Sequence, residues 1–331
     1  MPPRPFLTAL SALALGACSA GPRLPPAAAP DADPDAVSAL ELREGENFAV
    51  FSGEGERGSL DALLERASGV DVLLLGEEHD DPLTHRLQLE LLREAFVRWA
   101  APAGAPPAGH GARRPPNRGG RPIVLSLEMF ERDVQGVLDE YLAGLITEEQ
   151  LLSDARPWRN YRTDYRPLVE FARAHGVGVV AANAPRRYVN RASRLGRDSL
   201  AALPPGALET LAPLPWPEPS PRYRAQWDSL MGGAASHMSA TAIDGQTLWD
   251  ATMGHSLARA LGKSPGALVV HLAGSFHVER GTGIPETLAR YRPGTRVLAV
   301  VFKPEADPER FDPARHQDYG DYVILTREPG G

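Results

Sequence analysis

The sequence predicts an α/β protein with a mainly parallel β-sheet flanked by helices. Short apolar runs typical of buried strands alternate along the chain with segments of helical periodicity. Two of these runs, residues 73–75 and 267–273, are each followed by a glycine and, three positions later, a histidine. Because alternating strands and helices favour parallel pairing with right-handed crossovers, these runs are expected to share one sheet.

Length and composition narrow the class of protein. The chain of 331 residues is long enough for one large α/β domain, and its net charge of −7 argues against a general nucleic-acid binder. The sequence contains one cysteine, Cys18, which excludes an intramolecular disulfide and a cysteine-based zinc site.

The first residues resemble a bacterial lipoprotein signal. A basic start precedes a short apolar stretch, and small residues then lead to Cys18. Residues 1–17 are therefore expected to be removed and Cys18 to be lipidated, and Ser19 favours retention at the outer membrane. Residues 18–40, rich in Pro, Ala and Asp, are expected to form a flexible tether to the folded part, residues 41–331.

The first half of the folded part is expected to begin with an edge strand at 47–52. Ser59 is a typical N-cap for a helix over 59–67, and leucines at helical spacing predict another helix over 80–99, after the strand at 73–75. Residues 101–121 have almost nothing to bury and are expected to be a disordered insert. Apolar runs and periodicity then predict a strand at 123–128, helices at 134–145 and 163–175, and a strand at 177–182.

The second half is expected to contain a further helix opened by Pro185, a position that tolerates proline. Residues 203–221 are a Pro-rich insert, expected to be a lid or a long crossover. The remaining expected elements are a helix at 246–261, a strand at 267–273, a helix at 285–291 and strands at 296–302 and 322–326.

Polar side chains end four of the expected strands. They are Glu77 with His79, Glu128, Asn183 and His277. Because parallel strands share one carboxyl edge, these side chains are expected to converge. Two imidazoles with carboxylates suit a divalent metal site, or a general base oriented by a carboxylate. The alternative is that each polar group only caps a helix or orders a loop.

Two other histidines are expected to lie outside this site. His85 is six residues from His79, which places it off the same helix face, so it is expected to be a bystander. His271 lies inside a strand and is expected to be a packed core residue.

The Gly-Glu-x-His start, the Glu128 strand and the Gly-Ser-Phe-His end resemble a known family. It is the ChaN-like haem-binding lipoproteins of the Tiki and erythromycin-esterase superfamily. The resemblance runs from about residue 72 to residue 302. It also includes Trp158 and the segments 165–168, 183–186 and 249–253.

The resemblance implies haem binding, with a tyrosine ligand to iron and a haem-linked homodimer, in haem or iron uptake at the cell envelope. An outer-membrane receptor is an implied partner. Tyr165 is the first expected iron ligand, followed by Tyr161 and Tyr188, and His79, His277 and the arginines at 166, 186 and 187 are expected near the propionates. Arg186 is the arginine assigned to cofactor binding.

The same superfamily implies an alternative activity. In that reading the protein is a metal-dependent hydrolase, a peptidase or esterase. His79 and His277 hold a divalent metal ion, with Glu77 or Glu128 as ligand or base. The sequence favours the haem-binding protein over the enzyme.

Overall fold

A computed structural model describes residues 39–100, 120–232 and 239–328. Seven strands form one sheet in the order β1-β7-β6-β2-β5-β3-β4. All neighbouring strands pair in parallel except β1 with β7, which pair antiparallel. The strands are β1 (Phe48–Ser52), β2 (Val72–Glu77), β3 (Ile123–Glu131), β4 (Gly178–Asn183), β5 (Leu268–Gly274), β6 (Val297–Glu305) and β7 (Tyr322–Arg327).

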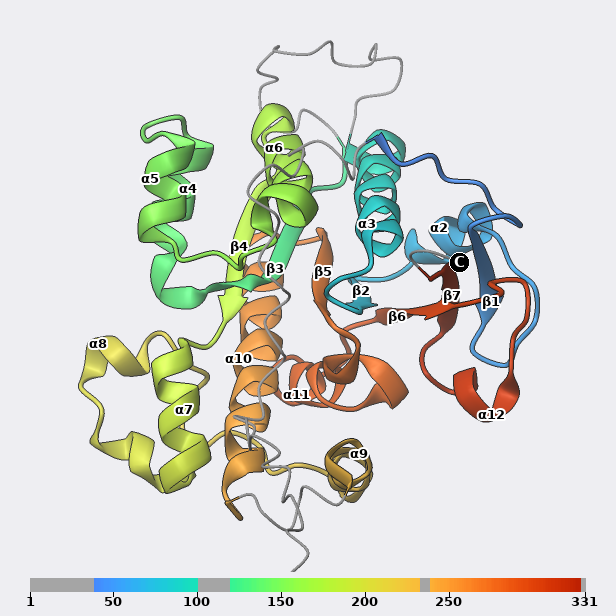
Figure 1. Ribbon diagram of the computed structural model, residues 1–331. Coiled ribbons are helices and arrows are strands. Elements are labelled where there is room, and N and C mark those ends of the chain that lie inside the picture. Colours follow the sequence, from blue (N-terminus) through green and yellow to red (C-terminus); the bar gives the residue numbers. More distant parts are fainter. Residues whose placement is uncertain (1–38, 101–119, 233–238, 329–331) are drawn as a thin grey trace, which may run out of the picture.

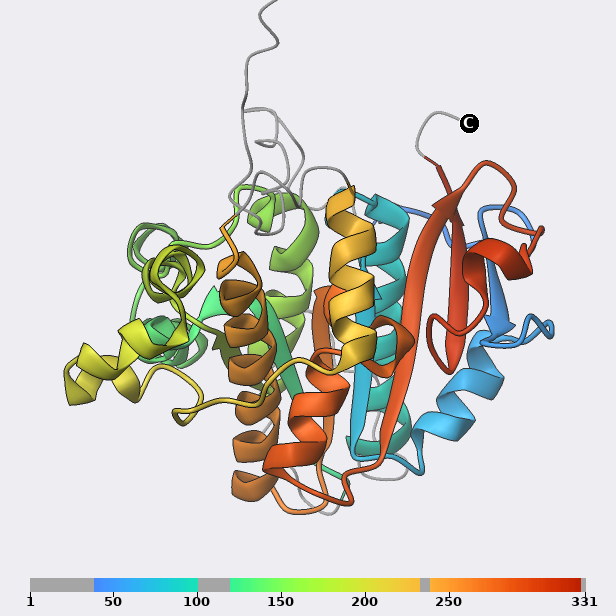
Figure 2. The same ribbon diagram turned by 90° about the horizontal axis from the view of Figure 1, so that it is seen from below.

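Helices cover both faces of the sheet (Figure 1). On one face lie α2 (Leu60–Ala67), α3 (Pro82–Ala95), α4 (Gln135–Leu142), α5 (Glu148–Asp154) and α6 (Arg166–His175). Figure 2 looks onto the other face, which α7 (Arg186–Leu195), α10 (Ala242–Lys263) and α11 (Ile284–Tyr291) cover. Three further helices are α8 (Pro205–Leu208), α9 (Pro221–Met231) and α12 (Pro313–His316). This two-sided arrangement is the predicted α/β architecture.

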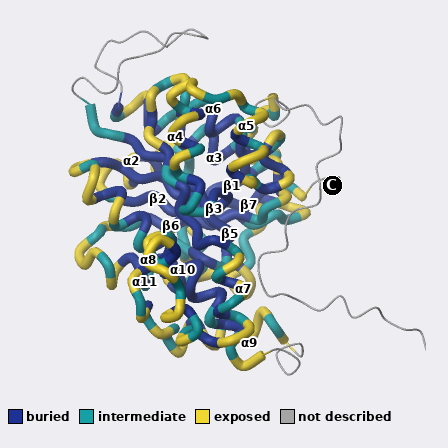
Figure 3. Tube along the Cα trace, turned by 90° about the vertical axis from the view of Figure 1, so that its left-hand side faces the viewer, coloured by how far each residue is buried: buried dark blue, intermediate teal, exposed yellow. Residues whose placement is uncertain are grey.

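The central strands are apolar because both of their faces are covered. In β2, Leu73 and Leu75 pack into the core under α3 and α6, whereas Val72 and Leu74 pack into the core under α10. All seven residues of β5 are also buried. Figure 3 shows these strands as a buried centre inside a partly exposed shell.

Several elements differ from the sequence prediction at their ends. The helix expected over 80–99 ends as α3 at Ala95, and one π-helical turn continues it over Phe96–Ala100. The expected Pro-rich insert contains the short α8 and leads into α9, which the sequence analysis did not anticipate. Of the insert predicted over 101–121, residues 101–119 lie outside the described residues, as do the signal and almost all of the tether.

In the part of the chain that the structure describes, no helix is both long and apolar enough to span a bilayer.

Candidate functional site

The carboxyl edge of the central strands carries the polar cluster. Strand β2 ends at Glu77, which lies beside Gly274, the last residue of β5. Because the two strands are parallel neighbours in this register, the turns that follow them bring His79 and His277 to the same place. Glu128 comes from β3, the next strand along the sheet.

The first half of the cluster is built around the Glu77 carboxylate, which is fully buried. Its Oε1 lies 2.8 Å from His79 Nδ1 and accepts a hydrogen bond from the Tyr165 hydroxyl. Its Oε2 accepts a hydrogen bond of 2.7 Å from Gln88 of α3. Glu77 therefore has both oxygens occupied, and it fixes the orientation of the His79 ring.

The second half repeats this arrangement with different residues. Asp250 of α10 holds His277 Nδ1 at 2.7 Å through Oδ1, and its Oδ2 accepts a hydrogen bond from Tyr223 of α9. Gly283, with φ of +64°, passes close to this pair, because a Cβ there would lie 2.8 Å from Asp250 Oδ1. Each imidazole is thus oriented through Nδ1 by a carboxylate that also binds a tyrosine.

The two halves meet at Gly274. A Cβ at this position would lie 2.9 Å from His79 Nε2 and 3.6 Å from His277 Cδ2, so glycine leaves room for both rings. The Gly274 backbone N–H donates to Glu128 Oε2 at 2.7 Å. The other oxygen, Glu128 Oε1, is buried without a hydrogen-bond partner among the described residues and lies 3.6 Å from His277 Nε2.

Glu77 and His79 shift each other's pKa in the direction that favours their charged forms. Burial alone would raise the pKa of Glu77, but the neighbouring His85, His79 and Tyr165 lower it overall. Burial would lower the pKa of His79, but Glu77 and Glu128 raise it above its usual value. The His79 side chain is 14% exposed and that of Glu77 is 0%, so the imidazole is the member that faces solvent.

His277 gives the cluster a testable pH dependence. Burial lowers its pKa, but Asp250 and Glu128 outweigh this and raise it to about 9. A raised pKa in the folded state contributes stability that is complete below about pH 6.5 and is lost as the pH rises through 9. We expect the melting temperature of the wild type to fall between about pH 6.5 and 9.5 more than that of His277→Gln. Equal falls in both proteins, measured by circular dichroism, would contradict this assignment.

The arrangement suits proton transfer more directly than metal binding. With both Nδ1 atoms held by carboxylates, His79 directs Nε2 toward Gly274, where a water or a substrate atom would exchange a proton. His277 Nε2 lies 3.6 Å from Glu128 Oε1 and 3.4 Å from the Gln246 amide nitrogen. No group of three or more His, Cys, Asp or Glu side chains within the described ranges could hold a metal ion. Glu77, one of the four predicted ligands, has both oxygens bound to other partners. The four-residue metal site stays a prediction.

The predicted haem ligands lie in different surroundings. Tyr165 is fully buried, and Glu77 and burial together raise its pKa well above 10. Tyr161 is also buried, and its hydroxyl has no hydrogen-bond partner in the described part of the chain. Tyr188 is half-buried, with the Arg187 guanidinium 4.4 Å from its ring. Neither Tyr165 nor Tyr161 presents its oxygen to solvent in this conformation.

Other predicted residues lie beside the cluster. Asn183 turns its side chain back to the backbone N–H of Ala184, and Arg186 opens α7 with its own N–H bound to Glu131. His271 is buried against Ser126, which agrees with its expected place in the core.

His85 was expected to be a bystander, but the structure places it beside the cluster. It is fully buried, with Nδ1 3.7 Å from Glu77 Oε2 and Nε2 3.7 Å from Asp164, and it therefore supports the site. Asp250 and Tyr223 were also missed, because only the packing of α9 and α10 brings them to His277. The sequence signal that was available is a charged residue, Asp250, inside an otherwise apolar stretch of helix.

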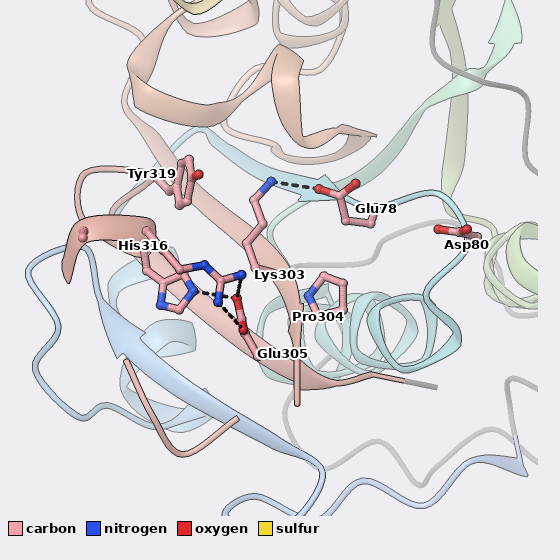
Figure 4. A pocket seen from close by; sticks show the side chains of 9 residues that line it. Glu78, Asp80, Lys303, Pro304, Glu305, His316 and Tyr319 are labelled. Carbon is pink, nitrogen blue, oxygen red and sulfur yellow. Dashed lines mark hydrogen bonds and ion pairs between the residues drawn. The ribbon is translucent and has the colours of Figure 1, made fainter. Parts of the chain in front are cut away.

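A cavity of about 470 Å³ lies next to the cluster, on the side of β2 toward β6 and β7 (Figure 4). Its walls are formed by Glu78, Asp80, Lys303, Pro304, Glu305, Ala314, Arg315, His316 and Tyr319. Lys303 directs its ammonium group to Glu78 at 2.8 Å and to Glu279 at 3.3 Å. The volume of the cavity falls within the range of roughly 300–1,000 Å³ that is typical of small-molecule sites.

Tyr319 is the tyrosine that lines this cavity. It is half-buried, and Lys303 Nζ and Arg280 Cζ lie 5.0 Å and 4.6 Å from its ring centre. Its hydroxyl has no hydrogen-bond partner in the part of the chain that the structure describes. This oxygen is therefore available to a ligand, unlike those of Tyr165 and Tyr161.

Comparison with known proteins shows that other structures share this fold. Over 87% of this chain and 100% of the other, the structure is similar to the one titled "Cofacial heme binding to ChaN of Campylobacter jejuni", with a TM-score of 0.61 and 15% sequence identity. The chain is 28% identical over 206 residues to "Protein RETICULATA-RELATED 5, chloroplastic" of Arabidopsis thaliana. That match covers 56% of this chain and 26% of the relative, so the chain spans about a quarter of that relative's length.

The family match covers most of the described cluster. Residues 63–288 fit the model of the family described as "Haem-binding uptake, Tiki superfamily, ChaN", a range that includes Glu77, Glu128 and His277. The predicted resemblance is confirmed, and this chain belongs to the ChaN family of the Tiki superfamily.

Proposed function

We propose that this protein binds haem and serves in haem or iron uptake. The observation that carries the proposal is the match of residues 63–288 to a family described as haem-binding uptake proteins. The likeness in fold to the Campylobacter jejuni protein supports it.

The cavity beside β2 is the place where the described residues suit haem best. Tyrosine is a known protein ligand to haem iron, and the Tyr319 hydroxyl is free to take this role. Lys303 and Arg280 lie beside the Tyr319 ring and place positive charge near the cavity. This assignment replaces Tyr165, which is sealed in the core with its hydroxyl on Glu77.

A second copy of the chain would complete this site. The apolar walls of the cavity are limited to Pro304, Ala314 and the Tyr319 ring, whereas a porphyrin needs apolar contact over two broad faces. A haem-linked homodimer, in which a second surface covers the remaining apolar face, would meet that need.

Titration of the purified protein with haemin tests the proposal. We expect a shifted Soret band that saturates at a fixed ratio of haemin to protein. Size-exclusion chromatography of the saturated sample should show an increase toward the mass of a dimer. A Soret band that changes only in proportion to added haemin, without saturation, would contradict haem binding.

We further propose that the protein is an outer-membrane lipoprotein anchored through Cys18, where an outer-membrane receptor is a fitting partner. The basic start, the short apolar stretch and Cys18 at the expected cleavage point support this address. Several acyl chains hold a protein firmly at a membrane, so Cys18→Ser should move it from the membrane to the soluble fraction. An unchanged membrane fraction for the variant would refute the anchor.

The acid–imidazole cluster favours a second function, hydrolysis of an ester or peptide. The specific observation is that His79 Nε2 lies beside Gly274, and that His277 Nε2 lies 3.6 Å from the unpartnered Glu128 oxygen. His79, oriented by Glu77, would take a proton from water, and it requires its neutral form to do so. Cleavage of fluorogenic esters or peptides that disappears in His79→Ala would support this function, above all if haemin does not bind.

A further inference from the structure

Four arginines gather at the carboxyl edge of β3 and β4, and we call them the arginine rim. Two lie in the α5–α6 connection and two at the start of α7: Arg156, Arg159, Arg186 and Arg187. Arg156 and Arg187 both bind Asp133, at 2.9 Å and 2.6 Å, and Arg156 also binds Glu131 at 3.0 Å. Because one carboxylate holds an arginine from each segment, the two segments lie side by side.

The α5–α6 connection links the rim to His79. The edge of Trp158 meets the His79 ring with centroids 4.6 Å apart, and the Asn160 amide donates to the His79 carbonyl oxygen at 2.9 Å. Arg159 lies between these two residues in the sequence and is exposed. The segment that carries Arg159 is therefore held against His79.

The rim carries positive charge that its own carboxylates do not neutralise. Glu131 and Asp133 are occupied by Arg156, Arg187 and the Arg186 backbone N–H. The side chains of Arg159 and Arg186 have no ion-pair or hydrogen-bond partner within residues 39–100, 120–232 and 239–328. The net charge of the whole chain is −7, so this positive charge is a local feature.

The chemistry of these groups identifies the kind of ligand. A guanidinium group presents a planar fork of donors that matches the oxygens of a carboxylate or a phosphate. Helix α7 begins at the rim, and its N-terminal end adds a positive partial charge. Two unpaired arginines on neighbouring segments suit a ligand with more than one acid group.

We propose that the arginine rim binds a small ligand that carries two or more carboxylate or phosphate groups, beside His79. The site is independent of the proposed haem cavity, which lies on the other side of β2, toward β6 and β7. Failure of haemin to bind would therefore leave this proposal standing.

Isothermal titration with citrate and with pyrophosphate, at constant ionic strength, tests the rim. We expect saturable binding of at least one of them by the wild type, and at least a tenfold weaker affinity in Arg159→Glu and in Arg186→Glu. Citrate alone would assign carboxylates and pyrophosphate alone phosphates. Arg290→Glu is the matched control, since Arg290 is an exposed arginine on α11 with no partner among the described residues. The affinity of this variant for the anion should stay within about twofold of the wild-type value.

Two results would overturn the proposal. One is a wild type that binds neither anion, and the other is an equal loss of affinity in Arg290→Glu, which would indicate a general effect of net charge. Arg159→Gln, which removes the charge without reversing it, should weaken binding less than Arg159→Glu. Thermal melting of each variant verifies that it is folded, so that lost binding reports on the rim itself.

Discussion

Replacing Glu77 by glutamine is expected to lower the free energy of unfolding by about 3–5 kcal/mol, the usual effect of breaking a buried ion pair. The carboxylate is fully buried, binds His79 and Gln88, and lies 3.7 Å from His85. Without its charge, the buried His85 and the partly exposed His79 lose a group that raises their pKa values. Urea denaturation of the two proteins at neutral pH measures the difference.

A second glutamate serves as the control for this prediction. Glu90 on α3 pairs with Arg86 at 2.9 Å, but its side chain is 31% exposed, so Glu90→Gln should cost less than about 1 kcal/mol. Because the pKa of Glu77 is lowered in the fold, its contribution is present at neutral pH and is lost as the pH falls below the ordinary value of about 4.3. A loss in Glu77→Gln no larger than that in Glu90→Gln would refute this role.

Replacing Tyr319 by phenylalanine is expected to weaken haemin binding at least tenfold. The substitution removes only the hydroxyl, so the ring keeps its place beside Lys303 and Arg280 and the cavity keeps its shape. The loss would therefore report on the bond to iron. Iron-free protoporphyrin, which has no such bond, should bind the wild type and the variant about equally.

Tyr165→Phe is the matched comparison. It removes a hydroxyl that donates to Glu77 inside the core, so it should lower stability while leaving haemin affinity within about twofold. Loss of haemin binding in Tyr165→Phe but not in Tyr319→Phe would identify Tyr165 as the iron ligand. The core around Tyr165 would then have to open to admit haem.

The fold was predictable because its signals are local. Each central strand is a continuous apolar run, since both faces of the sheet are covered. The long apolar stripe of α10 likewise predicts a helix. The end of α3 and the presence of α9 were not predictable in the same way. Tertiary packing decides where α3 changes to a π-helical turn, and a Pro-rich segment precedes α9.

The site was predictable in part. Glycine followed by histidine at two strand ends indicated where His79 and His277 would meet, and parallel pairing of β2 and β5 accounts for it. The partners of these histidines were not predictable, because Asp250 and Tyr223 reach His277 only through helix packing. The sequence also could not predict which tyrosine hydroxyl is accessible to a ligand. Tyr165 and Tyr319 differ in burial and not in sequence pattern.

We propose that Tyr319 ligates the haem iron, and the electron paramagnetic resonance spectrum of the ferric complex is the sharpest test of this bond. Tyrosinate is a weak-field ligand that leaves ferric haem high-spin, whereas two strong nitrogen ligands make it low-spin. We predict a high-spin signal for the wild-type complex that is lost or clearly altered in Tyr319→Phe. A low-spin wild-type complex, or a high-spin signal that Tyr319→Phe leaves unchanged, would show that Tyr319 is not the iron ligand.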